Sequence, residues 1–544
     1  MDSAWKSKEI GLIGVVVVVA IAAYISGLFV DVTRDGSKYA AVAREIFDSG
    51  DWIRLKIHGE PYDQKPPLLF WLSAASFHLF GLSNFAFKLP LLLSGMLGMY
   101  SLYRLAKGMY GPLVAHLAVA MTVTSQASFL YFMDIHTDTV LMPFVIFSLW
   151  QFWEFLDKGR SLNVYLGFVG IGLAMLVKGP VGAVVPFFAV ISYLLITRQY
   201  QRMLDYRWYL GILVTLVVIL PGLVGLMDQF GWEGIRFFFW TNNAERLAGR
   251  LGSSRGDYFF FFHNLLYQFA PWMILLYVAA FREFRSFWKR KQRDADNFLL
   301  GGIWVYFIIL ALSRGKLPNY IFMLIPLFAV LTAKHGSRLM ESQGSNAYKW
   351  LSVIQAAIYL LLATLIVALS VWLFPLGNLL LWLVVMMGLI LSAWVLLKGP
   401  SGMFRFFYPG MLLSAIFSLV VNAHVAPQIF AGQAPVHAAE IYNQQATAGE
   451  KIFNYNYESY ELFFYAKEPA YKLVNDLGLI DRMQQPGAWA LTERKVVERI
   501  DFPDPAPEII PLPHVWVNRL NWEYVNPATR SQATDTLFLL RSRF

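Results

Sequence analysis

The chain contains no cysteine among its 544 residues. This absence excludes disulfide bonds and thiolate metal sites, but it leaves the cellular compartment open. Charged residues are also scarce, at 15% against about a quarter in a typical soluble domain. Hydrophobic residues reach 57%, and the mean hydropathy is +0.49. These values predict a polytopic α-helical membrane protein rather than a soluble one.

The net charge of +9 does not indicate nucleic-acid binding, because the Lys and Arg residues lie in short segments between apolar runs. The first run, from Ile10 to Val30, lacks a small-residue cleavage site and is expected to be a retained helix rather than a signal peptide. Since a span needs about 20 apolar residues, the pattern predicts about 13 transmembrane helices. They are expected near residues 10–30, 86–105, 111–129, 138–156, 163–178, 181–197, 208–226, 264–281, 297–313, 318–334, 350–373, 378–397 and 404–423.

The distribution of basic residues predicts the orientation. If the N-terminus, with Lys6 and Lys8, is cytoplasmic, the even-numbered turns are cytoplasmic as well, as the positive-inside rule requires. These turns hold Arg104/Lys107, Lys158/Arg160, Arg198/Arg202/Arg207, Arg282 to Arg293, Lys334/Arg338/Lys349 and Lys398/Arg405. An odd number of spans then places the tail on the opposite side, which in a bacterium is the periplasm. The predicted location is therefore the bacterial inner membrane.

Two domains are expected, a transmembrane domain at 1–424 and a periplasmic α+β domain at 425–544. The tail has strand-like runs at Lys451–Tyr455, Ala488–Thr492 and Thr536–Arg541 between polar and Pro-rich turns. Its aromatic content argues against a disordered tail.

Unusual polar groups gather on the outer face in this topology. The outer segments are 31–71, 134–138, 178–180, 227–263 and 313–320, whereas the cytoplasmic turns hold little except topogenic Lys and Arg. No nucleotide pool exists outside the cytoplasm. An enzyme there would have to draw its substrate from an activated lipid or another membrane component.

Segment 31–71 is a predicted first outer loop with an interfacial helix. Its apolar stripe at helical spacing consists of Tyr39, Val42, Ala43, Ile46 and Phe47, and the opposite face carries Lys38, Arg44, Glu45 and Asp48. Asp35, near the start of this helix, is either a capping residue or a carboxylate aimed into a cleft. Lys65, before a Pro pair, either snorkels to the interface or binds a lipid phosphate.

Asp134 and Asp138 would share one face if the segment between them is helical, with His136 between them. The spacing matches no specific metal motif. Lys178 lies deep in an apolar stretch, where a lysine is costly. Pairing with one of the outer carboxylates is its simplest explanation.

The predicted large loop 227–263 carries four arginines, against the topogenic trend. They are Arg236, Arg246, Arg250 and Arg255, and Arg314, Lys316 and Tyr320 add to the same face. The planar guanidinium group suits phosphate, so an anionic ligand is indicated. A transferase that uses a polyprenyl-phosphate sugar needs carboxylates that accept a proton and cations that bind a phosphate. The predicted outer face has both kinds of group.

An ordered series of short motifs runs through the first 335 residues. It comprises Asp35, Tyr39-Ala40, Ala43-Arg44-Glu45, Gly50-Asp51-Trp52, Tyr62, Lys65-Pro66, LFG at 79–81, Asp138, LVKGP at 176–180, Gly231-Trp232, RFFFW at 236–240, Pro271-Trp272 and KLPNY at 316–320. The series resembles the bacterial branch of glycosyltransferase family 39. This branch has the GT-C fold and includes lipid A aminoarabinose transferases and relatives of the protein O-mannosyltransferases.

The resemblance implies a cavity open to the periplasm and transfer of a sugar from polyprenyl (undecaprenyl) phosphate with inversion at the anomeric carbon. Asp35 would be the principal catalytic carboxylate and Asp138 a supporting one. The candidate phosphate contacts are Lys65, Tyr320, Lys178, Arg246 and Arg255. The candidate substrate-lining residues are Tyr39, Tyr62, Lys38, Asp134 and Lys316.

Three positions depart from the aminoarabinose transferase pattern. Gln64 replaces an acidic residue that helps to bind a metal in the family, so no metal ligand is assigned and a divalent metal at this position is doubtful. Gly36 replaces an acidic residue, and Lys38 replaces an arginine. These changes favour a different sugar or acceptor.

The favoured acceptor is lipid A or another envelope glycan, and a secreted protein is the alternative. From a different class, a transporter or flippase of lipid-linked sugars would show mid-membrane charges and an internal repeat, neither of which is evident. A structural or receptor protein would not need paired acids with clustered arginines.

Overall fold

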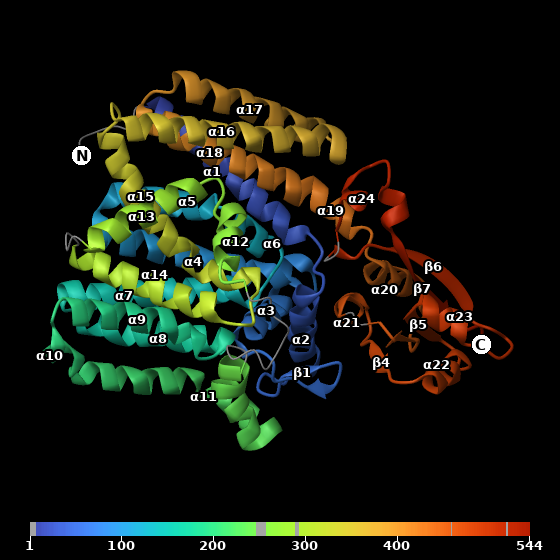
Figure 1. The fold of residues 1–544 in the computed structure, drawn as a ribbon. Coiled ribbons are helices and arrows are strands. Elements are labelled where there is room, and N and C mark those ends of the chain that lie inside the picture. The colour runs from blue at the N-terminus through green and yellow to red at the C-terminus, as the bar shows by residue number, and fades with distance from the viewer. Residues whose placement is uncertain (1–6, 246–256, 289–292, 458–459, 518–519) are drawn as a thin grey trace.

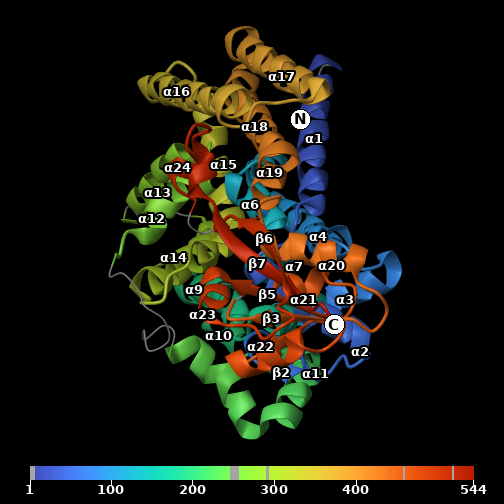
Figure 2. The same ribbon diagram turned by 90° about the vertical axis from the view of Figure 1, so that its right-hand side faces the viewer.

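A computed structural model describes residues 7–245, 257–288, 293–457, 460–517 and 520–544. A bundle of helices forms most of the molecule, and a mixed α/β region near the C-terminus lies at one end of it (Figure 1). The first segment of the bundle after the N-terminal helix faces this region (Figure 2).

The bundle consists of α1 (Ser7–Phe29), α2 (Asp35–Ser49), α3 (Leu68–Phe80), α4 (Asn84–Tyr110), α5 (Pro112–Val123), α6 (Gln126–Met133), α7 (Thr137–Lys158), α8 (Ser161–Lys178), α9 (Val181–Ile196), α10 (Tyr200–Met203), α11 (Tyr206–Arg236), α12 (Phe260–Gln268), α13 (Met273–Trp288), α14 (Asp294–Leu312), α15 (Ile325–Glu341), α16 (Asn346–Ala368), α17 (Leu379–Lys398), α18 (Gly402–Val420) and α19 (Ala426–Phe430). Shorter irregular helical turns are Phe237–Glu245, Pro318–Leu324, Leu369–Leu373 and Val421–Val425. A two-stranded hairpin, β1 (Lys56–Ile57) and β2 (Glu60–Pro61), follows α2.

The protein is a polytopic helical membrane protein. Among the described residues, ten helices are long and apolar enough to cross a membrane, or eleven if α5 and α6, which are bent by 50°, form one span. The expected number of about 13 is not confirmed on this criterion. The expected span 264–281 is divided between α12 and α13, and α9 has only 16 residues, which is short for a bilayer core about 30 Å thick.

The helix expected at 208–226 is longer than the hydropathy pattern indicated. α11 continues to Arg236, and a π-helical turn follows from Phe237 to Glu245. The helix bends at Gly231, whose φ of 58° and ψ of −147° suit a residue without a Cβ atom. The first part of the predicted loop 227–263, up to Glu245, is therefore helical. Helical backbone hydrogen bonding continues past the end of the apolar run.

One lysine assigned to a cytoplasmic turn has a different role. Lys334 is buried on α15, where its Nζ donates to Asp296 Oδ1 at 2.6 Å and also to Glu283. A buried ammonium group requires such partners. Lys334 therefore joins α13, α14 and α15, and it is not a simple topogenic charge.

The predicted amphipathic helix after the first span is confirmed as α2. Tyr39, Val42, Ala43 and Ile46 are buried as expected. Arg44, assigned to the polar face, is instead only 4% exposed. The reason is tertiary, because the C-terminal region covers that face of α2.

The C-terminal region is built on a five-stranded sheet in the order β4-β3-β5-β7-β6. Its strands are β3 (Lys451–Tyr455), β4 (Tyr471–Leu473), β5 (Ala488–Glu493), β6 (Glu508–His514) and β7 (Asp535–Arg541). Its helices are α20 (Ala434–Gln445), α21 (Glu461–Tyr465), α22 (Asp476–Met483), α23 (Arg494–Arg499) and α24 (Trp522–Val525). The three strand-like runs expected from the sequence correspond to β3, β5 and β7.

Strands β3, β4 and β5 are parallel, whereas β7 is antiparallel to both β5 and β6. β6 carries Pro511 and Pro513 and was not expected as a strand. It lies at the edge of the sheet, which is where a strand tolerates prolines.

The bundle and the C-terminal region share one hydrophobic core. Leu462, Phe463 and Phe464 of α21 belong to the same buried cluster as Phe77 and Phe87 of the bundle. The ring of Phe464 lies 6.0 Å from that of Phe77 and 6.2 Å from that of Phe87. This packing holds α21 against the segment that contains Asp35.

Candidate active site

Asp35 is the first residue of α2, and its side chain is exposed. The residue that precedes the helix is Arg34, and no side chain caps the helix end. The interpretation of Asp35 as a capping residue is therefore wrong. The carboxylate lies at the positive end of the helix dipole, accessible to a substrate.

Two buried tyrosines lie beside Asp35. Tyr39 is 5% exposed and Tyr62 is 3% exposed. Burial raises the pKa of both phenols well above the ordinary value, and the negative charge of Asp35 raises each further. Both side chains are therefore neutral hydrogen-bond donors. Within the described residues, Tyr62 Oη has no hydrogen-bond partner, so this buried hydroxyl is available to a ligand.

Asp138 forms the second part of the site and is completely buried. Lys178 Nζ donates to its two carboxylate oxygens at 2.7 and 2.6 Å, and Asn319 Nδ2 donates to Oδ2 at 2.6 Å. The ion pair joins α7 to α8 and to the turn Pro318–Leu324. The hypothesis that Lys178 pairs with one of the candidate carboxylates is confirmed, and the partner is Asp138.

Lys178 also orders Tyr320, because its Nζ lies 4.3 Å from the centre of that ring. The charge of Asp138 and the phenol of Tyr320 both act on Tyr39, as Asp35 does. The charges of both carboxylates therefore act on Tyr39. The structure therefore groups five side chains that are linked by electrostatic interactions, namely Asp35, Tyr39, Tyr62, Asp138 and Tyr320.

Asp134 and Asp138 do not share a helical face, because the chain leaves the helix between them. α6 ends at Met133 and α7 begins at Thr137. Instead, Asp134 Oδ2 lies 3.4 Å from His136 Nε2. Burial lowers the pKa of His136, but the hydrogen bond to Asp134 and the charges of Asp134, Asp138 and Asp35 outweigh it, so the net pKa is raised.

Lys38 lies against Gln64, whose Oε1 accepts from Lys38 Nζ at 2.5 Å. The same ammonium group lies 5.6 Å from the ring centre of Tyr62 and 5.3 Å from that of Tyr460. The described part of the chain brings no three His, Cys, Asp or Glu side chains together in a metal-binding cluster. The expectation that Gln64 disfavours a divalent metal at this position stays a prediction.

Lys65 is half-buried at a small pocket between the hairpin segment and α11. Its walls include Tyr62, Asp63, Pro67, Gln229 and Phe238. Burial raises the pKa of Asp63. Lys65 and Tyr62 both line this pocket, so its walls carry a cation and a neutral hydrogen-bond donor.

The remaining basic candidates have different positions. Lys316 Nζ donates to the backbone carbonyl of Asp257 at 2.7 Å and lies 5.4 Å from the ring centre of Tyr258. Arg236 is exposed, 3.9 Å from Glu233. Arg246 and Arg255, and also Arg250, lie outside the described residues. Their expected phosphate contacts stay predictions.

The sequence pattern did not identify two residues of this site, Asn319 and Tyr460, or the buried Lys88 on α4. Asn319 completes the bonding of Asp138, and its only signal was its place in the KLPNY motif. Tyr460 reaches Lys38 from the C-terminal region, for which no motif was available. Lys88 is fully buried on α4 and donates to the carbonyls of Gly27 and Val30 at the end of α1; a lone lysine at the start of an apolar run was its signal.

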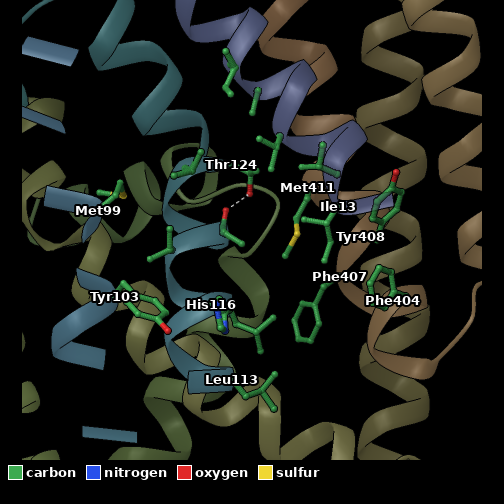
Figure 3. A pocket seen from close by; sticks show the side chains of 18 of the residues that line it. Ile13, Met99, Tyr103, Leu113, His116, Thr124, Phe404, Phe407, Tyr408 and Met411 are labelled. Carbon is green, nitrogen blue, oxygen red and sulfur yellow. Dashed lines mark hydrogen bonds between the residues drawn. The ribbon is translucent and has the colours of Figure 1, made fainter. Parts of the chain in front are cut away.

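A separate apolar cavity of about 850 Å³ lies among α1, α4, α5 and α18 (Figure 3). Its walls are mostly aliphatic and aromatic, including Ile13, Met99, Phe407 and Met411 (Figure 3). None of the candidate site residues lines it. Its surface suits a hydrocarbon chain rather than a reaction of polar groups.

Comparison with known protein families gives one family match. Residues 64–224 match the model of the dolichyl-phosphate-mannose-protein mannosyltransferase family. This stretch includes Lys65, Asp138 and Lys178, but it covers less than half of the chain.

Several curated relatives share a longer part of the sequence. The undecaprenyl phosphate-α-4-amino-4-deoxy-L-arabinose arabinosyl transferase of Edwardsiella ictaluri is 28% identical over 322 residues, which is 57% of this chain and 56% of that protein. The enzyme of the same description from Serratia proteamaculans is 27% identical over 353 residues, which is 63% of this chain and 61% of that protein. The chain therefore matches little more than half the length of these relatives.

Solved structures extend the likeness to almost the whole fold. ArnT from Cupriavidus metallidurans, bound to undecaprenyl phosphate, superposes with a TM-score of 0.75 over 98% of both chains at 19% identity. Its apo structure gives a TM-score of 0.72 with the same coverage. Together, these comparisons confirm the resemblance inferred from the motif series and its fold.

Proposed function

We propose that this chain, a glycosyltransferase family 39 relative with the GT-C fold, transfers a sugar from polyprenyl phosphate to lipid A or another envelope glycan. Undecaprenyl phosphate is the favoured carrier, because the curated relatives are described by it and one structural neighbour binds it. The observation that carries the proposal is the exposed Asp35, whose charge acts on the buried Tyr62, a residue that lines the same pocket as Lys65.

The proposed reaction is a single displacement. Asp35 accepts the proton of an acceptor hydroxyl, or contacts an acceptor phosphate, as the acceptor oxygen attacks the anomeric carbon. The bond between that carbon and the donor phosphate oxygen breaks, and polyprenyl phosphate leaves with the bonding electrons. Attack from the face opposite the leaving group inverts the anomeric configuration.

The leaving phosphate needs positive charge and hydrogen-bond donors. Lys65 and Tyr62 are proposed to supply them from the pocket beside α11, with Tyr320 across the site. Lys178 acts mainly through Asp138 and Tyr320, because its ammonium group is already bonded to a carboxylate. Arg246 and Arg255 are proposed as further phosphate contacts, and Tyr39, Lys38, Asp134 and Lys316 as substrate-lining groups.

The proposed topology has 13 spans. They are the ten long helices, the bent pair α5 and α6 as one span, and the two shorter helices α9 and α13. The N-terminus is then cytoplasmic, and the C-terminal domain at 425–544 is periplasmic. The contacts of Tyr460 and Tyr465 with the segment 32–38 support a common side for the site and this domain. The transmembrane domain is proposed to occupy residues 1–424 of a protein in the bacterial inner membrane.

Protein O-glycosylation is the second candidate, suggested by the description of the matching family model. It is less favoured because the relatives that match more of the chain are described as arabinosyl transferases. Transport of lipid-linked sugars is less favoured because the carboxylates and Lys178 gather at one end of the bundle.

The test is reconstitution of the purified chain with undecaprenyl-phosphate 4-amino-4-deoxy-L-arabinose and lipid A. Mass spectrometry should detect a glycosylated acceptor and free undecaprenyl phosphate with the intact protein and at least one of the donors tested, and neither product with Asp35→Asn. Parallel reactions with other undecaprenyl-phosphate sugars and with a protein acceptor identify the substrate pair. Absence of transfer from every donor, with detectable movement of the donor across the vesicle membrane, would instead favour a transporter.

A further inference from the structure

The backbone immediately before Asp35 has an unusual conformation. Arg34 has a φ of 53° and a ψ of −117°, a region that a residue with a Cβ atom rarely adopts. Such a conformation persists only where its surroundings enforce it. Because Arg34 directly precedes Asp35, its backbone angles determine where α2 begins and the direction in which the Asp35 carboxylate extends.

Two side chains of α21 hold this turn. Glu461 Oε1 accepts from the backbone amide of Arg34 at 2.6 Å, and Tyr465 Oη accepts from the amide of Val32 at 2.7 Å. Glu461 is only 5% exposed, so its charge-assisted bond is poorly screened by water. Its second oxygen, Oε2, accepts from the amide of Tyr460 at 3.1 Å, which fixes the orientation of the carboxylate.

Arg44 of α2 anchors α21 in return. Its Nη1 contacts the carbonyl oxygens of Phe463 and Phe464 at 3.2 Å each and that of Ala466, and its Nη2 contacts that of Lys467 at 3.1 Å. These are carbonyls at and beyond the end of α21, where a cation is favourable. The helix that supplies Glu461 is thus fixed to the helix that begins with Asp35.

We infer that Glu461 is a positioning residue for sugar transfer: by accepting the Arg34 amide hydrogen, it fixes the backbone turn that directs Asp35 toward the attacking group of the acceptor. This inference rests on the proposed function, in which Asp35 contacts the reacting groups. It gives the C-terminal region a role in the reaction, since the active-site turn is complete only when α21 is docked. Glu461 itself acts through Arg34 and does not contact the substrate.

The test uses the full-length protein with variants at both ends of the hydrogen bond. Glu461→Ala removes the acceptor, whereas Glu461→Gln keeps an oxygen that can accept from the amide. We expect Glu461→Ala to lower kcat by about tenfold to a hundredfold, the cost of a misplaced reacting group. Its KM for the donor should change little. Glu461→Gln keeps an oxygen for the Arg34 amide but loses the one that accepts from the Tyr460 amide, so its kcat should lie between those of the wild type and Glu461→Ala. Glu468→Ala, an exposed glutamate on the same segment, is the matched control.

The decisive variant is Glu461→Ala combined with Arg34→Gly. Glycine adopts a positive φ without steric cost, so the turn depends less on the acceptor, and kcat should recover. Glu461→Ala with Arg34→Ala keeps the Cβ atom and should not recover, which separates the backbone from the Arg34 side chain. A merely structural role of Glu461 would lower the melting temperature, and this glycine would not restore kcat selectively.

Two results would overturn the inference. One is unchanged kcat in Glu461→Ala; the other is a loss of kcat that Arg34→Gly does not reverse and that follows the melting temperature. Asp35→Asn separates this failure from failure of the proposed function. If Asp35→Asn is inactive while Glu461→Ala is normal, only the positioning role is wrong. If Asp35→Asn is fully active, the proposed catalytic assignment is wrong and the positioning role falls with it.

Discussion

Lys178 Nζ lies 2.6 Å from Asp138 Oδ2, and Asp138 is completely buried. The pair connects two helices at the end of the bundle that carries Asp35. Removing one partner of such an ion pair destabilises the folded protein, because the other partner is left as a buried charge without compensation. It therefore behaves as a fixed unit that also holds Tyr320.

This pairing predicts a specific stability pattern. Asp138→Asn should lower the free energy of unfolding by about 3–5 kcal/mol, the usual cost of removing one partner of a buried ion pair. The double variant Asp138→Asn with Lys178→Met should be more stable than the single variant, because no unpaired ammonium group remains. Thermal unfolding of the detergent-solubilised proteins measures both effects. Equal destabilisation by the single and the double change would contradict the coupling.

Asp35→Asn should reduce sugar transfer by at least about a hundredfold, since it removes a general base without changing shape. The fold should be unaffected because the side chain is exposed. Initial rates of product formation in proteoliposomes measure the effect. Glu60→Gln, at an exposed glutamate of the same segment 31–71, is the control and should retain full activity. Near-normal transfer by Asp35→Asn would remove Asp35 from the reaction.

Lys65→Ala should weaken donor binding by at least about tenfold, the lower range for loss of a hydrogen bond to a charged group. Binding of undecaprenyl phosphate to the solubilised protein, followed by intrinsic fluorescence, measures this directly. Lys56→Ala changes a lysine of the same segment outside the pocket and should bind normally. If Lys65→Ala keeps wild-type affinity, the lysine only extends to the membrane interface.

Tyr62→Phe separates packing from ligand binding. The hydroxyl has no partner within the described residues, so its removal should change the free energy of unfolding by no more than about 0.5 kcal/mol. Transfer activity should nevertheless fall if a ligand uses the hydroxyl. The pair of measurements is a melting curve and a rate for each protein. A stable variant with an unchanged rate would show that the hydroxyl is not used.

His136 predicts a pH dependence of stability. Its pKa is raised in the folded protein, because the hydrogen bond that it donates to Asp134 and the charges of Asp134, Asp138 and Asp35 outweigh the effect of burial. The stabilisation is therefore fully present below the ordinary histidine pKa of about 6.5 and is lost as the pH rises through the raised value. It amounts to at most about 1 kcal/mol because both side chains are partly exposed. Melting temperatures from pH 5.5 to 9 should fall less steeply for His136→Gln than for the wild type, and parallel curves would reject this assignment.

Segment 31–71 illustrates what the sequence could predict. The apolar stripe of α2 and the order of Asp35, Tyr39, Tyr62 and Lys65 are local patterns, and local patterns survive folding when a helix lies at an interface. Arg44 was misplaced because its environment depends on α21. That helix is more than 400 residues away in the chain, and nothing near Arg44 indicates it.

The same distinction applies to Asp134 and Asp138. Their spacing of four residues suggested one helical face, but a break at residues 134–136 separates them. The partners of Asp138 come from α8 and from the turn at 318–324. Helical periodicity carries no information about such breaks or about which neighbouring helix supplies a partner.

The sequence by itself determined the membrane class, the positions of most apolar helices, three of the five C-terminal strands and the chemical groups of the site. These properties arise from composition and periodicity over about 20 residues or fewer. Only the tertiary structure decided that Lys178 neutralises Asp138, that Tyr460 meets Lys38, and that Glu461 holds the amide of Arg34 from 427 positions further along the chain. The reason is physical: a buried charge or a strained turn is stabilised by whichever group folding brings within hydrogen-bond distance, and that distance is independent of separation in sequence.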